Sequence, residues 1–197
     1  STLGSNATTG LISNSGTWNK SGSINVTHTD SPFNNTGTVK VYDGIFRLDN
    51  SGTDTGTYSA FVGEGPVGSL QFNGGTRNFN NGVLIAGSGN FIFSGGTQNF
   101  NDGASFNVSN PLAITGAAVN FTNGTIASTI SDISLNSGTL NLSSGLNFNL
   151  TNLTVSGGTL TGSDTINVSS AFNWTGSSVL RGTGTLNTQS GSTSTLN

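Results

Sequence analysis

The sequence predicts an all-β fold, a right-handed parallel β-helix (β-solenoid) with about nine coils of roughly 20 residues. Three observations support this fold class. A Gly-Thr step recurs at nearly constant spacing, apolar and polar residues alternate between the steps, and the composition is rich in Gly and poor in charge. The 197 residues are enough for one domain with its own core, so we expect a single solenoid domain over residues 1–197.

The Gly-Thr steps recur at intervals of 19 to 26 residues when the degenerate step Gly116-Ala117 is counted with them. In a parallel solenoid, equivalent residues stack about 4.8 Å apart, so nine steps predict a rod of roughly 43 Å. Because the intervals vary, some coils must carry inserted loops. We expect one continuous ladder, interrupted at Ala117. It consists of Gly16, Thr17, Gly37, Thr38, Gly56, Thr57, Gly75, Thr76, Gly96, Thr97, Gly138, Thr139, Gly158, Thr159, Gly184 and Thr185.

The segments between the steps indicate short strands. Residues 69–82 (SLQFNGGTRNFNNG) and 90–103 (NFIFSGGTQNFNDG) match at a shift of 21 residues, and residues 146–150 (LNFNL) alternate strictly. Alternation of this kind predicts half-buried strands of three to five residues, and frequent Gly disfavours helices. Asn-Gly pairs at 73–74, 81–82 and 123–124 leave antiparallel hairpins, as in a β-sandwich, open as the rival fold.

The two ends differ from the repeats. Residues 1–15 alternate little and residues 189–197 are nearly all Ser, Thr and Gly, so both ends are expected to be irregular. The string GEGPVG at 63–68 predicts a loop that leaves one coil. No amphipathic helix covers either end, and the chain contains no Met. We therefore expect a processed product or a fragment of a longer repeat protein.

Charge and composition limit the partners. Eight acids and five bases give a net charge of −3, which creates no field for nucleic acid. No apolar run is long enough to span a bilayer, so no membrane span is expected. The absence of Cys excludes disulfides, thiolate catalysis and Cys-based zinc sites. A Cys-free chain rich in Asn and Thr is typical of an exported bacterial protein, so an extracellular or cell-surface location is expected.

Three segments carry a resemblance to a known group of proteins: residues 137–145 (SGTLNLSSG), 157–170 (GGTLTGSDTINVSS) and 181–191 (RGTGTLNTQSG). Together with the spacing over residues 10–188, they resemble the β-solenoid repeat regions of large bacterial surface proteins. These are filamentous-haemagglutinin-type exoproteins and autotransporter passengers. The resemblance implies secretion, a structural shaft, adhesion to a cell surface, matrix or glycan ligand, and no catalytic residues. Exposed solenoid ends would also allow self-association.

An enzyme is the alternative function, because parallel β-helices also include polysaccharide lyases and hydrolases. Such enzymes need two or three carboxylates gathered in a groove. The closest group in the sequence is Asp43, Asp49 and Asp54, with Lys40 and Arg47 nearby. The eight acids scatter when they are placed on a 20-residue coil, so we expect charges on outward faces or turns and no catalytic site.

The remaining residue types offer little for metals or cofactors. His28 is the only histidine, and Asp30 lies two residues away, which favours an ordinary surface pair over a catalytic triad. One His and no Cys disfavour a transition-metal site. The strings GGTRNFNNG and GGTQNFNDG lack the Asp of a calcium-binding repeat. We therefore expect no metal and no cofactor.

Two surface features could still bind a ligand. A flat array of Thr can order water and bind ice, but T-x-T strings do not recur here in register. The Thr ladder has bulky neighbours that would spoil a flat face if they also pointed outward. A purely structural Thr ladder is therefore the preferred interpretation. Exposed aromatic side chains could instead stack on sugars, and the candidates are Trp18, Tyr42, Tyr58 and Trp174, of which Trp174 is expected in the core.

Overall fold

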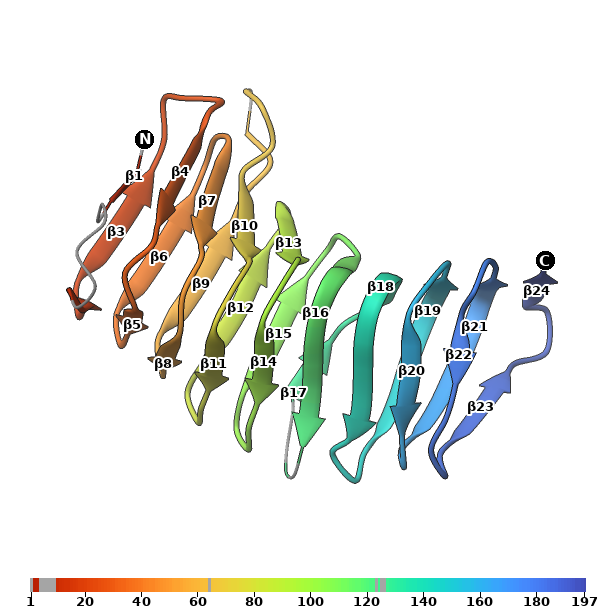
Figure 1. The fold of residues 1–197 in the computed structure, drawn as a ribbon. Coiled ribbons are helices and arrows are strands. Elements are labelled where there is room, and N and C mark those ends of the chain that lie inside the picture. The colour runs from red at the N-terminus through yellow and green to blue at the C-terminus, as the bar shows by residue number, and fades with distance from the viewer. Residues whose placement is uncertain (1, 4–9, 64, 123, 125–126) are drawn as a thin grey trace.

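A computed structural model describes residues 2–3, 10–63, 65–122, 124 and 127–197. Over these residues every regular element is a strand, and the strands pair in parallel with their counterparts in neighbouring coils. The coils stack into a right-handed β-solenoid of about eight turns, close to the nine predicted from the Gly-Thr steps. The predicted fold class is confirmed, and the rival arrangement of antiparallel hairpins is wrong for the paired strands (Figure 1).

The strands form three faces of a rod, which we number 1 to 3. Face 1 contains β1 (Thr2–Leu3), β4 (Val26–Thr29), β7 (Ile45–Leu48), β10 (Ser69–Phe72), β13 (Asn90–Phe93) and, at the C-terminal end, β24 (Thr193–Leu196). Face 2 contains β2 (Ile12–Asn14), β5 (Phe33–Asn35), β8 (Gly52–Asp54), β11 (Thr76–Phe79), β14 (Thr97–Phe100), β20 (Thr159–Gly162) and β22 (Val179–Leu180). Face 3 contains β3 (Thr17–Lys20), β6 (Thr38–Val41), β9 (Thr57–Ala60), β12 (Leu84–Gly87), β15 (Ser105–Val108), β17 (Ala127–Thr129) and β23 (Thr185–Thr188).

Four longer strands bend round a corner and contribute to two faces. β16 (Leu112–Thr122) and β18 (Asp132–Ser143) run from face 1 to face 2, and β19 (Asn147–Val155) and β21 (Thr165–Trp174) run from face 3 to face 1. In β16 and β18 the corner carries a register shift, which lets the strand turn without ending.

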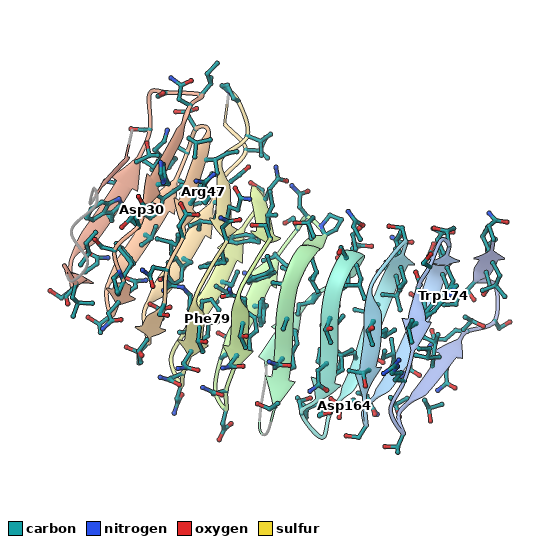
Figure 2. All side chains as sticks on the ribbon, viewed as in Figure 1. Asp30, Arg47, Phe79, Asp164 and Trp174 are labelled. Atoms are coloured by element: carbon teal, nitrogen blue, oxygen red, sulfur yellow. The ribbon has the colours of Figure 1, made fainter. Side chains whose placement is uncertain are left out.

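The core is a continuous apolar column inside the rod. Alternate residues of each strand point inward, as the period-2 pattern predicts, and the side chains of equivalent residues stack from coil to coil. Phe79, Phe100 and Phe121 stack face to face, with ring centroids 4.4 and 4.9 Å apart. Figure 2 shows side chains along the whole rod and labels Phe79 within it. Because each coil covers the next, no coil can bury its apolar residues alone.

The structure explains why glycine precedes the ladder threonine at Gly96. Its φ of 69° lies in the left-handed region, which a side chain disfavours. A Cβ on Gly96 would also overlap the backbone oxygen of Gly75 in the coil before it. Gly at this corner therefore allows both the turn and the close approach of successive coils.

The predictions for the loop and the ends have mixed outcomes. No strand occurs among the described residues between β9 and β10, which confirms the loop near 63–68, although Glu64 itself lies outside the described residues. The expectation of irregular ends is wrong for β2 and for β24, because β24 pairs with β21. Residues 1 and 4–9, and Asn123 of the third Asn-Gly pair, lie outside the description. In the part of the chain that is described, no helix has the length and apolar character needed to cross a membrane.

Candidate functional site

The Gly-Thr ladder is divided between two faces and does not form the single column expected. Thr17, Thr38 and Thr57 are paired in register on face 3, where the next residue in the column is Leu84. A second column begins on face 2 at Thr76. The prediction fails because the loop between β9 and β10 changes where the next Gly-Thr step falls in its coil, a change that constant spacing hides.

The second column continues along face 2. Thr76, Thr97, Thr139 and Thr159 belong to it, and Ala118 stands between the second and third of these. The interruption is therefore at Ala118, one residue later than the Ala117 expected from the sequence. The last ladder residue, Thr185, lies on face 3, where it pairs with Thr165.

The three acids of the enzyme alternative each have separate partners. The Asp43 carboxylate accepts a hydrogen bond from the Gly22 backbone N–H at a corner of the rod (2.9 Å). Asp49 follows β7 on face 1, whereas Asp54 is fully buried inside the rod. Lys40, the base expected beside them, is half-buried on face 3. Asp43, Asp49 and Asp54 therefore do not form the one carboxylate group that the sequence suggested.

A cluster of charged and polar side chains lies on the surface of face 1, around Asp49. The His28 Nδ1 is 2.9 Å from Asp49 Oδ2 and 3.4 Å from Asp30 Oδ1. The Arg47 Nε donates to the same Asp49 carboxylate, at 2.8 Å from Oδ1, and the Asn73 Nδ2 donates to Oδ1 at 2.7 Å. The cluster is assembled by stacking, because His28 and Arg47 are paired residues of β4 and β7. Figure 2 labels Asp30 and Arg47 in these N-terminal coils.

These contacts decide what the cluster can do. Burial alone would raise the pKa of Asp49, but hydrogen bonds from Arg47, Asn73 and His28 and the Arg47 charge outweigh it and lower the pKa. Ligand atoms of His28, Asp30 and Asp49 lie within 4.8 Å of one another, a spacing that a metal ion could bridge. However, the guanidinium and the amide already engage the Asp49 carboxylate, and a guanidinium repels a cation. The arrangement fits an ion-pair cluster better than a set of metal ligands.

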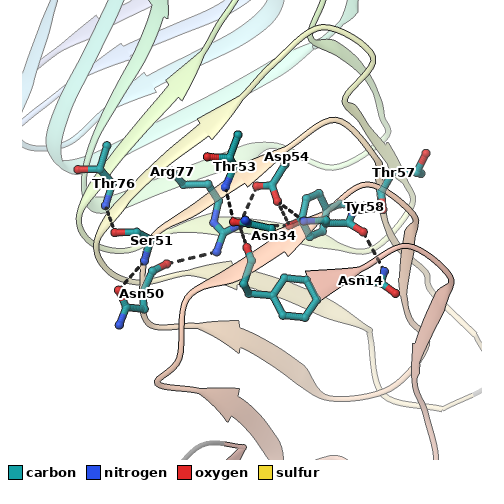
Figure 3. Close-up of polar contacts among 12 residues, drawn as sticks. Asn14, Asn34, Asn50, Ser51, Thr53, Asp54, Thr57, Tyr58, Thr76 and Arg77 are labelled. Atoms are coloured by element: carbon teal, nitrogen blue, oxygen red, sulfur yellow. Dashed lines mark hydrogen bonds and ion pairs between the residues drawn. The ribbon is translucent and has the colours of Figure 1, made fainter. Parts of the chain in front are cut away.

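A second polar cluster lies inside the rod and was not predicted. The Arg77 side chain points inward from β11, and its Nη1 is 2.7 Å from Asp54 Oδ2 (Figure 3). The same nitrogen donates to the Phe33 carbonyl (2.8 Å), and Nη2 donates to the Asn50 carbonyl (3.2 Å). The Tyr58 hydroxyl donates to Asp54 Oδ1 (2.9 Å). The cluster therefore cross-links three coils through fully hydrogen-bonded charges.

Burial controls the ionisation of this inner cluster. Desolvation raises the pKa of Asp54 above its ordinary value, although Arg77 and the hydrogen bonds from Asn35 and Tyr58 oppose the rise. Desolvation also raises the pKa of Tyr58 well above the usual value, so the phenol remains a hydrogen-bond donor. One sequence signal could have revealed the cluster, since Arg77 occupies the inward position directly after a Gly-Thr step. By contrast, nothing in the sequence shows that Gly52 lies beside Arg77 in the neighbouring strand.

The aromatic candidates divide between core and surface. Tyr58 is fully buried and Trp18 is partly buried against Phe33 and Phe46. Trp174 is packed against the core, as expected, but is only half-buried. Tyr42 is 39% exposed and stacks on Phe61 of the next coil, with ring centroids 5.0 Å apart. Tyr42 is therefore the candidate that offers an accessible aromatic surface.

The fold and these clusters define the class of the protein, a β-solenoid repeat protein whose polar side chains are organised by stacking. No protein-family model matches the chain, and neither a curated protein nor a solved structure matches it. The functional argument therefore depends on the geometry described above.

Proposed function

We propose that this chain is a non-catalytic structural segment of a secreted or cell-surface bacterial protein, in which the solenoid serves as a rigid shaft for adhesion or assembly. The observation that carries the proposal is the continuous stack. In-register parallel pairs follow one another along face 1 from β4 to β18, and paired strands continue from β18 to β24. A rod in which each coil is covered by its neighbours resists bending and presents side chains at fixed spacing.

The adhesive part of the proposal rests on the resemblance to bacterial exoproteins and on one exposed patch. Ile24, Tyr42, Val62 and Val67 are 69%, 39%, 52% and 38% exposed, in or beside the segments that leave the coils between faces 3 and 1. An exposed aromatic ring beside apolar side chains suits contact with a glycan or with a protein of the matrix or cell surface. The separate positions of Asp43, Asp49 and Asp54 favour the shaft over a polysaccharide-cleaving enzyme.

Two measurements test the shaft. Small-angle X-ray scattering of the chain should give the profile of a rigid rod, roughly 40 Å long for stacked coils about 4.8 Å apart. A compact sphere or a flexible chain would contradict it. Incubation with acidic and neutral polysaccharides should leave their chain length unchanged, whereas cleavage would support the enzyme alternative.

Adhesion needs a separate test. Beads coated with the protein should bind bacterial or host cells or immobilised glycans, and Tyr42→Ser should weaken that binding. Val179→Ser is the matched control, because Val179 has a similar exposed fraction (37%) at the other end of the rod. Equal binding by beads coated with an unrelated protein would remove adhesion from the proposal and leave the shaft untouched.

Self-association is a further prediction of the proposal. In the last strands Leu180 is 55% exposed and Leu196 is 68% exposed, so apolar surface is available on them. Sedimentation velocity over a wide concentration range should detect oligomers, and Leu180→Asn should reduce them. A monomer at every concentration would contradict self-association.

A further inference from the structure

One outward surface of the rod has a regularity that the shaft does not require. It lies on face 2 between β11 and β20, and we call it the Thr/Asn array. It is made of two parallel columns, one at the first residue of each strand segment and one at the third. The first column contains Thr76, Thr97, Ala118, Thr139 and Thr159, and the second contains Asn78, Asn99, Asn120, Asn141 and Thr161.

The residue between the two columns points inward in every coil. Arg77, Gln98, Val119, Leu140 and Leu160 occupy this position, and each is 0 or 1% exposed. The bulky neighbours that would have spoiled a flat face therefore lie in the core. The array contains no aromatic, long or charged side chain, so its surface follows the plane of the sheet.

The side chains of the array are held in place by one another. The Asn99 amide donates to the Asn78 side-chain oxygen (2.9 Å), and the Asn120 amide donates to that of Asn99 (3.0 Å). Thr is β-branched and stiff at χ1, and each Thr packs against its counterpart one coil away. Such side chains have little conformational entropy to lose when they bind a rigid surface.

The geometry gives the array the character of a two-dimensional lattice. Neighbouring coils are about 4.8 Å apart, and the two columns of one strand are about 7 Å apart. Five coils then give a surface roughly 19 Å long, on which hydroxyl, amide and methyl groups alternate without charge. On the N-terminal side the array ends at a hollow of about 360 Å³, lined in part by Thr53, Thr76 and Asn78.

We propose that the Thr/Asn array binds ice. Hydroxyl and amide groups at fixed, short spacing hold water molecules in a layer that can merge with the ice lattice, and the methyl groups exclude disordered water between them. Charged groups would instead bind their own hydration shells. This activity goes beyond the proposed shaft and does not depend on it.

The other faces are charged or apolar in their N-terminal coils. A similar neutral array occurs at the C-terminal end of face 3, where Asn149, Asn167 and Asn187 of β19, β21 and β23 form a hydrogen-bonded column. On face 3 the outward positions include Lys40 in β6 and the apolar pair Leu84 and Ala86 in β12. On face 1 the outward positions include His28 and Arg47 of the ion-pair cluster. The paired neutral run on face 3 spans three coils, whereas the array on face 2 spans five, so face 2 offers the larger surface.

The first experiment measures thermal hysteresis and ice-crystal shape in solutions of the whole chain. The protein should lower the freezing point below the melting point and turn round ice discs into faceted crystals. Folding is checked in parallel by circular dichroism. A folded protein that leaves ice discs round and gives no hysteresis up to millimolar concentration would overturn the proposal.

Variants then locate the surface. Thr97→Tyr and Thr139→Tyr place a large ring in the array and should each lose most of the hysteresis. Thr38→Tyr is the matched control, because Thr38 is also the half-buried first residue of a strand but lies on face 3, and it should retain the activity of the unmodified protein. Equal loss in Thr38→Tyr and Thr97→Tyr would contradict the assignment to face 2.

A gain of activity gives the most demanding test. Ala118→Thr completes the first column with the residue that its neighbours carry, so it should raise the hysteresis above that of the unmodified protein. The change preserves the fold more readily than an added ring, and it remains informative if the Tyr variants fail to fold. An unchanged or lower hysteresis in folded Ala118→Thr would count against the array as the binding surface.

Discussion

The N-terminal coils and the coils beyond β13 share one backbone arrangement but have different interiors. In the N-terminal coils the inward positions include the polar residues Asn35, Asp54 and Arg77, all buried and hydrogen-bonded. Beyond β13 the inward positions are almost entirely Phe, Leu, Ile and Val. The comparison shows that a stacked solenoid tolerates either interior, because the buried charges of Asp54 and Arg77 are paired between neighbouring coils.

One inward column of face 2 changes from polar to apolar along the rod. It consists of Gly52, Arg77, Gln98, Val119 and Leu140. Gly52 leaves room for the Arg77 guanidinium, because a Cβ there would overlap it. Gln98 follows with a buried side-chain oxygen that has no hydrogen-bond partner among the described residues. The next two residues are apolar. The two regions should therefore respond differently to substitution, by loss of packing in one and by loss of charge pairing in the other.

The largest effect is expected in the apolar region, at Phe100. Its ring is stacked between those of Phe79 and Phe121, so Phe100→Ala leaves a cavity that rigid neighbouring coils cannot fill. The free energy of unfolding should fall by about 3–5 kcal/mol, measured by urea denaturation. Leu196→Ala is the control at a 68% exposed position and should change it by no more than about 0.5 kcal/mol. A loss below 1 kcal/mol (on the order of a surface change) at Phe100 would show that the interior relaxes freely.

The polar interior should be as sensitive to the loss of one charge. Arg77→Ala leaves the Asp54 carboxylate buried without its cation and should cost about 3–5 kcal/mol in the same measurement. Arg47→Ala removes an ion pair at the surface and should cost at most about 1 kcal/mol.

A double variant sharpens this contrast. Arg77→Met with Asp54→Leu should recover much of the loss, because an apolar pair needs no partner, although Tyr58 and Asn35 lose an acceptor. A double variant less stable than Arg77→Ala would show that the network contributes more than the pairing of its two charges.

Gly52 tests whether the guanidinium needs the space. Gly52→Ala places a Cβ against Arg77 and the Phe33 carbonyl, so we expect a loss of about 1–3 kcal/mol by urea denaturation. Gly16→Ala is the matched control, because a Cβ there meets nothing within 4 Å. The effect at Gly52 should become smaller in an Arg77→Met background, and the part that remains is caused by overlap with the Phe33 carbonyl.

Gln98 should respond in the opposite direction. Gln98→Met removes the unpaired buried oxygen and keeps the length of the side chain, so it should stabilise the protein by at most about 1 kcal/mol. The gain is limited because the amide nitrogen donates to the Gly95 carbonyl (2.9 Å), a bond that is lost. Destabilisation would indicate that this bond outweighs the unpaired oxygen.

The smallest expected effect concerns pH and the ion-pair cluster of face 1. The pKa of Asp49 is lowered in the folded protein, so its contribution to stability is present above the unfolded-state value of 3.8 and is lost as the pH falls through the folded value. Asp49→Asn should therefore flatten the acid side of the stability curve as the pH falls below the unfolded-state value of 3.8. Asp54, whose pKa is raised, works in the opposite sense, so stability should rise as the pH falls through its range. If stability falls equally steeply with acid in the unmodified protein and in Asp49→Asn, Asp49 has no such role.

Much of the fold could be predicted because each coil repeats the same pattern of alternating apolar and polar residues. Strict alternation in residues 146–150 led directly to the inward Phe148 and Leu150. The position of the Gly-Thr ladder could not be predicted in the same way. Spacing alone cannot show that the loop near 63–68 places the next Gly-Thr step on another face. The inner ion pair was hidden for a similar reason, since Asp54 and Arg77 are neighbours only after the coils stack.

The sequence by itself determined the class of fold and the spacing of the coils, because local alternation and Gly at corners act within a single coil. Only the tertiary structure decided which residues share a column and which way each column points. That choice depends on stacking between coils, where a loop of a few residues changes the face on which a Thr lies. It places Arg77 in the core beside Asp54 and gives five neighbouring coils of face 2 a flat, neutral surface.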